Sequence, residues 1–406
     1  MANNKNTKVP NVPNLRFPEF EGEWMESTIG KQFELYSGNT PSRLNKDYFK
    51  GEINWISSGE LKDHYIYSSK EKISQEASLN LKLLPAGTFI IAIYGLEAEG
   101  VRGTGSIIKE QSTISQACMA FSSIGEVENE FLYSWYKKHG NIIGLKYAQG
   151  TKQQNLSYDI LERFKIAYPS KQEQEKLYNF ISLLDERIAT QNKIIEKLQS
   201  LIKGLNDNIH KGIKGETVCF SDLGEAYSGL SGKGGDDFGY GEPFITYMNV
   251  YQNTYISEKD YELVQIAPNE KQNSVQYGDA LFTLSSETPE EVGIGAVYLG
   301  NTQKLYLNSF CFGIHFYDER VLPQYLAHFI SSSSFRRAIY PLAQGSTRFN
   351  LQKNDFMKMK FLLPSLEKQG HIANTLDALH CRLANEKSLT EQYILLKKYL
   401  LSLMLI

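Results

Sequence analysis

The sequence predicts a mixed α/β fold in which two globular domains are separated by two long, antiparallel coiled-coil helices related by a pseudo-twofold axis. Three observations support this prediction. A segment of the chain occurs twice, each copy carries an apolar seam at heptad spacing, and each copy follows a block rich in short strand-like runs. The 406 residues leave room for two or three domains.

The repeat is the strongest of these observations. The stretch AQGTKQQNL, which begins at Ala148, returns as AQGSTRFNL, which begins at Ala343. A gapless alignment of the chain with itself at this shift of 343 − 148 = 195 residues gives 17 identities over the 58 positions from Ala148 to Leu205. Unrelated sequences would match at roughly one position in sixteen. A period this long indicates a duplicated domain with its connector, not a solenoid of short repeats.

Each connector is predicted to be one long helix, over residues 170–211 and 366–405. Ser170 and Glu173 are expected to form a capping box at the start of the first helix. Apolar residues alternate steps of three and four, which is the a/d pattern of a coiled coil. The central seam positions are Leu184, Ile188, Gln191 and Ile195 in the first helix, and Leu379, Leu383 and Glu386 in the second.

The second seam is expected to continue one residue early, through Leu389 and Leu396, which would be a stammer. Two helices that cannot bury such stripes alone most simply pack on each other. In an antiparallel pair Gln191 and Glu386 would meet near the centre. The alternative is that each helix packs on its own domain.

The two blocks of short strand-like runs, with Gly and Ser between the runs, are predicted to be the globular domains. They cover residues 27–146 and 215–341. The other predicted parts are an N-terminal arm (1–26), a central region (147–214) and a C-terminal region (342–406).

The sequence carries no recognisable catalytic motif. It has no GxxxxGK[ST], no strand followed by GxGxxG, and no GxSxG. The four cysteines form no CxxC pair and the seven histidines lack zinc-site spacing, so we expect no metal site and a reducing compartment. No apolar run approaches the roughly 20 residues that cross a bilayer, which favours a cytoplasmic protein without a membrane partner.

Polar side chains at the ends of predicted strands are the candidates for reading the edges of nucleic-acid bases. They are Ser57, Ser58, Tyr94, Arg102 and Thr104 in the first domain, and Thr246, Tyr247, Asn249, Ser285 and Ser286 in the second. The alternative for each is an ordinary solvated loop residue. Charge argues against strong binding by the chain alone, because the second domain has a balance of 7 − 16 = −9 and phosphate neutralisation dominates non-specific affinity.

Together these features resemble the specificity subunit of Type I restriction-modification systems. The resemblance covers essentially the whole chain: the opening VPNLRFPEFEGEW, two variable domains, and two repeated regions with long helices. The AQGT and AQGS elements, each followed by Asn and Leu, match the motif at the end of each recognition domain of that family.

The resemblance implies that each domain is a target recognition domain reading one half of a split double-stranded DNA target. It implies that the helices fix the spacer, and that the chain recruits two methyltransferase subunits and, through the complex, restriction and translocation subunits. S-adenosylmethionine, ATP and Mg would belong to those partners, and this chain would be non-catalytic. Carried over to the motif, it implies DNA contacts by Gly150, Thr151, Lys152, Gly345, Ser346, Thr347 and Arg348.

Two other functions stay open at the level of sequence. The chain could be a non-catalytic scaffold whose domains bind protein or glycan, which the acidic second domain favours slightly. A self-contained enzyme that methylates and cuts is disfavoured by the missing motifs.

Overall fold

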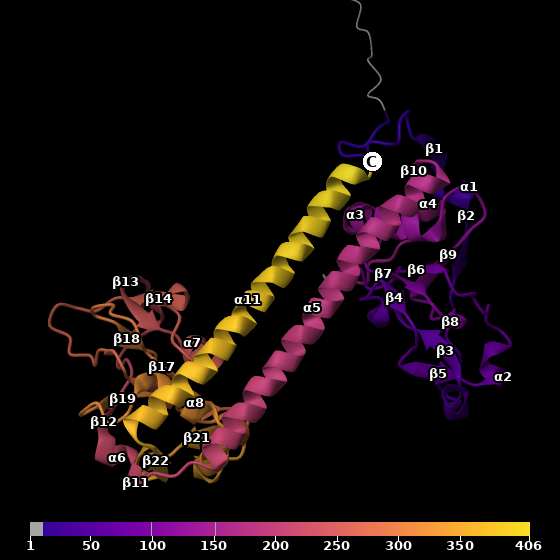
Figure 1. Cartoon of the computed structure of the whole chain (residues 1–406). Coiled ribbons are helices and arrows are strands. Elements are labelled where there is room, and N and C mark those ends of the chain that lie inside the picture. The colour runs from indigo at the N-terminus through magenta and orange to yellow at the C-terminus, as the bar shows by residue number, and fades with distance from the viewer. Residues whose placement is uncertain (1–10, 99, 151) are drawn as a thin grey trace, which may run out of the picture. The chain divides into compact units, whose positions relative to one another are not determined.

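The computed structural model describes residues 11–98, 100–150 and 152–406 of the chain. These residues form two compact units, one made of the described residues up to Asn192 together with residues 388–406, and the other of residues 193–387. The two long helices, α5 (Lys171–Lys211) and α11 (Leu366–Met404), each contribute one half to each unit (Figure 1). The division therefore passes through the helices and not at the predicted domain ends, because each half helix packs on the globular domain of its own unit.

The globular part of the first unit is built from two sheets and one long covering helix. Five strands are ordered β2-β9-β6-β7-β4, three are ordered β5-β3-β8, and β1 pairs separately with β10. The strands are β1 (Met25–Thr28), β2 (Phe33–Ser37), β3 (Ile53–Ile56), β4 (Tyr65–Ile66), β5 (Glu71–Ile73), β6 (Phe89–Ala92), β7 (Gly105–Ile108), β8 (Ser112–Ile114), β9 (Cys118–Ser123) and β10 (Lys165–Tyr168). The helices are α1 (Ile29–Gln32), α2 (Gln75–Ser78), α3 (Asn129–Tyr147) and α4 (Tyr158–Glu162).

The second unit repeats this plan with a smaller main sheet. Its sheets are ordered β12-β19-β15-β17, β14-β13-β18 and β16-β21-β20, and β11 pairs with β22. The strands are β11 (Glu216–Cys219), β12 (Gly224–Ser228), β13 (Phe238–Ile245), β14 (Tyr261–Val264), β15 (Ala280–Thr283), β16 (Ser285–Ser286), β17 (Gly295–Val297), β18 (Tyr306–Leu307), β19 (Cys311–Phe316), β20 (Ala343–Gln344), β21 (Phe349–Leu351) and β22 (Lys360–Leu363). The helices are α6 (Phe220–Leu223), α7 (Tyr247–Gln252), α8 (Pro323–Ser331), α9 (Ser333–Ile339) and α10 (Lys353–Met357). The predicted mixed α/β class is thus confirmed.

A buried glutamine makes equivalent hydrogen bonds in both copies of the repeat. The Gln174 side chain donates to the Pro169 carbonyl at 2.9 Å and accepts from the Glu128 backbone N–H at 2.9 Å. Gln369 donates to the Pro364 carbonyl at 2.9 Å and accepts from the Leu322 N–H at 2.7 Å. Both side chains are fully buried. Each glutamine therefore ties the start of a long helix to the N-terminus of the domain helix, α3 or α8, that packs beside it.

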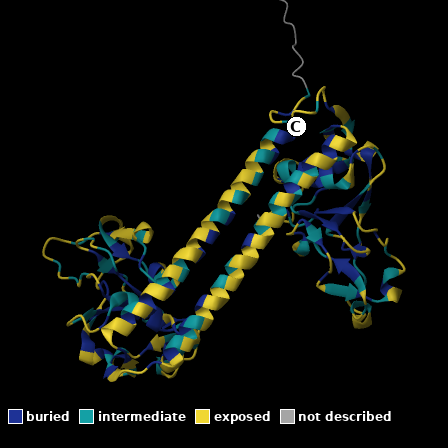
Figure 2. Ribbon diagram, in the orientation of Figure 1, coloured by how far each residue is buried: buried dark blue, intermediate teal, exposed yellow. Residues whose placement is uncertain are grey.

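The helix seams are buried along their length, while the remaining faces are mostly exposed (Figure 2). Gln191, Leu383 and Glu386 are buried, and Leu184, Ile188, Ile195 and Leu379 are half-buried. Within the first unit the two half helices run antiparallel. Lys397 pairs with Asp185 at 2.5 Å, and the Arg187 guanidinium lies 5.5 Å from the centre of the Tyr393 ring. The residue number along α11 therefore falls as the residue number along α5 rises.

The predicted stammer in the second helix is wrong. Leu396 is 43% exposed, whereas Thr390 is buried and Lys397 is half-buried. The seam therefore continues in register with polar residues at Thr390 and Lys397. The heptad pattern indicated the neighbouring leucines because apolar residues are expected at seam positions, and a lysine that buries its alkyl chain and pairs its charge there is not apparent from the sequence.

The capping box is only half formed. Ser170 Oγ accepts from the Glu173 N–H at 3.4 Å. The buried Glu173 carboxylate does not turn back to Ser170; it receives the Arg16 guanidinium at 2.7 and 2.8 Å and the Trp24 indole N–H at 3.3 Å. It thereby fastens the N-terminal arm to α5.

A polar cluster in each unit joins the globular domain to the long helices. In the first unit the His64 ring stacks between Tyr65 and Tyr133, with 3.9 Å between ring centres on each side, and faces Asp185 of α5. In the second unit Tyr255 and His328 both bond to Asp377 of α11, at 2.6 and 2.8 Å. Each domain is thus held on the helices by directional contacts as well as by apolar packing.

Candidate nucleic-acid interface

The repeated AQG element forms a hairpin in both domains. In the first motif hairpin, residues 148–156, the backbone groups of Gln149 and Asn155 exchange two hydrogen bonds of 2.9 Å. In the second motif hairpin, residues 343–351, β20 pairs with β21 in the same way, with Gln344 opposite Asn350. The conserved spacing between Gln and Asn in the two copies is therefore the register of a hairpin.

The glycine of the motif is required by the shape of the turn. Gly150 has φ +121° and Gly345 has φ +140°, a region that side chains with a Cβ rarely adopt. A Cβ at either position would also overlap a carbonyl oxygen of the same turn, that of Gln153 or of Arg348. At the glycine and at the Gln–Asn pair the two hairpins therefore share one backbone geometry.

The structure brings several of the predicted first-domain readers next to the first motif hairpin. Ser57 follows the end of β3 and Tyr94 follows β6, and Tyr94 forms a β-bridge with Asn155. The loop before β9 lies between them, because Ser115 donates its backbone N–H to Ile56 at 2.9 Å. The ends of three strands and the hairpin thus converge on one place.

The second domain has the same convergence. Thr246 follows the end of β13, and the Asn308 backbone N–H donates to Ile245 at 3.0 Å. Ser285 lies opposite Asn350 and Ser286 opposite Phe349 in the sheet that contains the second motif hairpin. The Tyr247 hydroxyl donates to the Ser285 carbonyl at 2.9 Å, and burial raises the pKa of Tyr247.

Some of the residues predicted to read bases use their polar groups for hydrogen bonds within their own loops. Arg102 donates to the carbonyls of Leu96 and Glu97 at 2.9 and 3.3 Å, and Thr104 donates to Val101 at 2.7 Å. Ser57 donates to the Glu60 carboxylate at 2.8 Å.

Three of the residues predicted to read bases in the second domain are buried and also bond within their own loops. Asn249, Ser285 and Ser286 are all buried. The Asn249 amide bonds to both backbone groups of Ser257, and the Ser286 hydroxyl donates to Glu291 at 3.2 Å. These residues shape the loops, and Ser58 stands half-buried in the loop after β3. Their contact with DNA stays a prediction.

The motif hairpins themselves present the most accessible polar groups. Gly150, Lys152, Gly345, Ser346, Thr347 and Arg348 are all exposed, and Thr151 lies outside the described residues. The first hairpin is tied to the loop after β6, since the Gln154 N–H donates to Glu97 at 2.9 Å and thereby lowers the pKa of that carboxyl group.

Sequence reasoning missed Phe310, which stands where the strand ends and the motif hairpin of the second domain meet. We call this place the convergence zone. Its ring is 54% exposed, and the Arg348 guanidinium lies 5.7 Å from the ring centre. A signal for it was present, because NSFCFGI in the second domain aligns with SQACMAF in the first and places Phe310 opposite Ala117.

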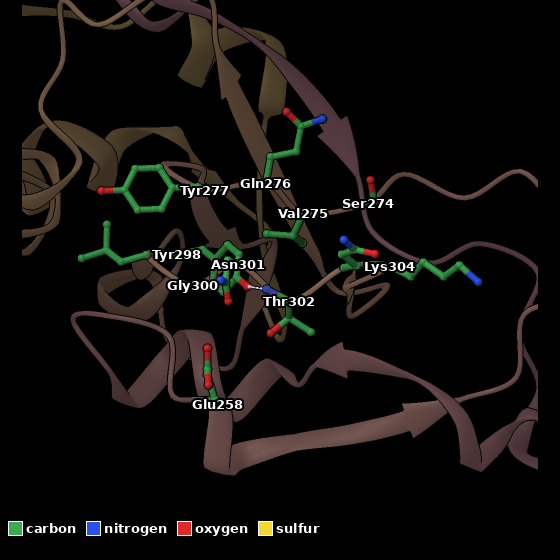
Figure 3. A pocket seen from close by; sticks show the side chains of 12 residues that line it. Glu258, Ser274, Val275, Gln276, Tyr277, Tyr298, Gly300, Asn301, Thr302 and Lys304 are labelled. Atoms are coloured by element: carbon green, nitrogen blue, oxygen red, sulfur yellow. Dashed lines mark hydrogen bonds between the residues drawn. The ribbon is translucent and has the colours of Figure 1, made fainter.

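A separate hollow of about 880 Å³ lies on the second domain (Figure 3). It is lined mostly by polar side chains, among them Glu258, Gln276, Asn301 and Thr302, and the buried Tyr298 hydroxyl accepts from the Thr302 N–H at 2.7 Å. None of the predicted readers lines it, so it is distinct from the convergence zone.

Neither a metal-binding cluster nor a membrane span occurs in the described part of the chain. Within residues 11–98, 100–150 and 152–406, no group of three or more His, Cys, Asp or Glu side chains is placed to hold a metal ion. In the same residues no helix is long and apolar enough to cross a bilayer.

A protein-family model described as the Type I restriction modification DNA specificity domain matches this chain twice, over residues 21–200 and 215–392. The MjaIX specificity subunit of a Type I restriction enzyme of Methanocaldococcus jannaschii is 30% identical over 187 residues, which are 43% of this chain and 42% of the relative. The MjaVIII specificity subunit from the same organism is 21% identical over 421 positions, covering 96% of this chain and 93% of the relative. The chain thus spans less than half of the first of these relatives and nearly all of the second.

Two solved structures share the fold. The S subunit of a Type I restriction-modification system from M. genitalium aligns with a TM-score of 0.55 and 13% identity, over 97% of this chain and 99% of its own. A chain from a structure that addresses complex assembly and conformational transition of the type I R-M system aligns with a TM-score of 0.59 and 15% identity, over 93% of this chain and 96% of its own.

Proposed function

The chain belongs to the Type I restriction-modification DNA specificity family, and we propose that it is the sequence-recognition subunit of such a system. Each recognition domain reads one half of a split target on double-stranded DNA. The observation that carries the proposal is the pair of motif hairpins. Both are built on a glycine that a Cβ would disrupt, and both stand where the ends of three strands converge.

The duplication suits a target with two halves. A DNA duplex is close to twofold symmetric, so one chain that reads two blocks needs two readers on related scaffolds. The loops around the hairpins differ between the domains, which lets the two blocks differ in sequence. The helices α5 and α11 join the readers and set the length of the unread spacer.

The partners in this proposal are two methyltransferase subunits, and through them the restriction and translocation subunits. Two equivalent residues on the long helices support such docking. Leu201 and Leu396 are both leucine, correspond at the shift of 195, and are 54% and 43% exposed. Large exposed apolar side chains on a helix favour a protein partner, and Leu395 and Tyr399 beside Leu396 are exposed as well. Two copies of one surface suit two copies of one subunit.

Catalysis belongs to the partners. S-adenosylmethionine, ATP and Mg bind to the methyltransferase and translocase subunits, and this chain contributes recognition and assembly in the cytoplasm. The net charge of −3 fits this division of labour, because the partners then supply most of the phosphate contacts.

Binding experiments with purified components test this function. The chain alone should bind a target duplex weakly and with a shallow dependence on salt, because it neutralises few phosphates, and addition of methyltransferase subunits should produce tight, sequence-dependent binding. Equal affinity for target and random duplex in the complete complex would contradict the proposal. A methyl-transfer assay on the isolated chain should give no product.

The docking surface has its own test. Leu201→Glu with Leu396→Glu should abolish co-purification with the methyltransferase subunits. The matched control is Lys203→Gln with Lys398→Gln, at another pair of identical, exposed helix positions, and it should leave assembly intact. Assembly that survives the leucine changes would place the docking surface elsewhere.

The helices as a spacer ruler can also be tested. One additional helical turn in each long helix, about 5.4 Å, corresponds to roughly 1 to 2 base pairs of DNA at about 3.4 Å each. Methylated sites should then show a spacer longer by that amount. An unchanged spacer in an assembled, active complex would exclude the ruler.

A further inference from the structure

The second recognition domain carries an exposed aromatic ring with a guanidinium group over it, at a position where the first domain carries neither. We propose that Phe310 and Arg348 form a joint contact with DNA in the second half-site, in which the ring packs against the edge of a base and the guanidinium neutralises a neighbouring phosphate. The inference rests on the proposed function and goes beyond it by assigning a contact of stated chemistry to one half of the target.

The two positions can be compared because the backbone around them is the same in both domains. In the first domain Ile93 donates its N–H to the Ala117 carbonyl at 2.9 Å, and Leu156 of the motif hairpin donates to Ile93 at 2.9 Å. In the second domain Leu284 donates to the Phe310 carbonyl at 2.8 Å, and Leu351 donates to Leu284 at 2.8 Å.

The turn that carries the aromatic residue is equivalent as well. Cys118 donates to the Ser115 carbonyl at 3.0 Å, and Cys311 donates to the Asn308 carbonyl at 3.0 Å. Phe310 therefore occupies the place of Ala117, and Arg348 occupies the place of Gln153. Within one backbone frame, a small residue and an amide are exchanged for a ring and a cation.

The ring is held in place but not covered. The Phe310 N–H donates to the Asn308 side chain at 2.9 Å and its carbonyl accepts from Leu284, so both backbone groups are fixed. The side chain is nonetheless 54% exposed. A phenylalanine on a rigid turn loses little conformational freedom when it binds, and its exposed face gains from apolar contact with a base edge such as the thymine methyl group.

The cation is available to a ligand. Among the described residues, Arg348 makes no hydrogen bond and no ion pair, and its side chain is exposed over the Phe310 ring. This is unusual beside a domain whose residues 215–341 carry 7 basic and 16 acidic side chains, where an arginine would readily find a carboxylate. An unpaired guanidinium beside an apolar ring suits the boundary between a base and its phosphate.

The neighbouring groups give the site polar edges. Tyr247 and Tyr251 stack with 6.0 Å between ring centres, and a hydrogen bond from the Tyr251 hydroxyl lowers the pKa of Glu291. The buried Ser285 and Ser286 lie in the strand beside the hairpin and pair with it. The first domain has Tyr94 at the corresponding strand end but lacks both ring and cation at the hairpin, so the two halves engage DNA differently.

The test uses the chain assembled with methyltransferase subunits, and duplexes that carry both target blocks, only the first block, or only the second. The variant Phe310→Ala with Arg348→Gln gives the second domain the residues of the first. It should weaken binding to the complete target and to the second-block duplex by about tenfold or more, because it removes both the apolar contact with a base edge and the cation beside the phosphate. Binding to the first-block duplex should not change.

Tyr277→Ala removes another exposed aromatic residue of the second domain, away from the hairpin, and should leave all three affinities unchanged. A photoreactive phenylalanine analogue at position 310 should crosslink within the second block. Full affinity of the double variant for the complete target would overturn the proposal, as would an equal loss on the first-block duplex or crosslinks only in the first block. If the unaltered complex shows no preference for its target, the proposed function fails first, and the two failures are thereby distinguished.

Discussion

Replacing Gly150 with alanine should damage recognition far more than it damages stability. Two routes are open to the variant. The first motif hairpin can stay closed, with alanine at φ +121° and its Cβ against the Gln153 carbonyl. Such a strained backbone costs about 1–3 kcal/mol, and displacement of the carbonyl adds to this cost. Alternatively, the hairpin can open and lose the two hydrogen bonds between Gln149 and Asn155.

The second route limits the loss of stability. Each main-chain hydrogen bond contributes about 1 kcal/mol net, so opening the hairpin costs about 2 kcal/mol. The free energy of unfolding should therefore fall by no more than about this amount, and the melting temperature by a few degrees. The turn that presents Lys152 would lose its shape in either case. We expect the rate of methylation at target sites to fall at least tenfold.

The matched control is Gly87→Ala. Gly87 also has a positive φ, +88°, but a Cβ there would meet nothing within 4 Å. This variant should lose about 1 kcal/mol from backbone strain alone and should methylate its target at the normal rate. Calorimetry and methylation kinetics on the assembled complex give both quantities. Normal methylation by Gly150→Ala would refute the view that the shape of the hairpin serves recognition.

Three further predictions follow from buried polar groups. Gln369→Met leaves the Leu322 N–H without its partner and should lower the free energy of unfolding by about 2–4 kcal/mol in urea titrations, and a loss under 0.5 kcal/mol would contradict the role of this clamp. Removal of the Lys397 or the Asp185 side chain alone should lower the free energy of unfolding by about 2–4 kcal/mol, whereas replacing both residues with leucine should lower it by much less than the sum of the two. Additive losses would show that the pair is not coupled. Burial lowers the pKa of His328 despite the nearby carboxylate, so the unfolded chain takes up the proton at a higher pH than the folded chain, and the free energy of unfolding should decline as the pH falls from 7 to 5. The variant His328→Asn should flatten that decline. An unchanged slope would show that other groups cause it.

The sequence was most informative where geometry follows from spacing. Heptad spacing identified the seam of α5 from Leu184 to Ile195, and the repeat identified two equivalent AQG elements, which the structure shows to be hairpins. Periodicity failed at the end of α11, where Lys397 lies on the seam. Its ammonium group is paired with Asp185 by a contact that sequence spacing cannot show.

The roles that depend on the three-dimensional path of the loops could not be predicted. Gln174 and Gln369 are identical in the repeat, but nothing in the pattern indicates that they clamp a second helix. Arg102 was a reasonable candidate for reading a base edge, yet its guanidinium holds its own loop. Phe310 was hidden because an exposed phenylalanine in an apolar run has the sequence signature of a core residue.

The measurement that tests the central claim most directly is a map of modified bases. The chain would be co-expressed with the methyltransferase subunits of a Type I system from the same host, and every methylated adenine on the plasmid would be located by single-molecule sequencing. We predict one split motif, two short specified blocks around a spacer of fixed length, which changes only in its second block when the second domain is altered. A continuous motif, or methylation without any motif in an assembled complex, would contradict the account.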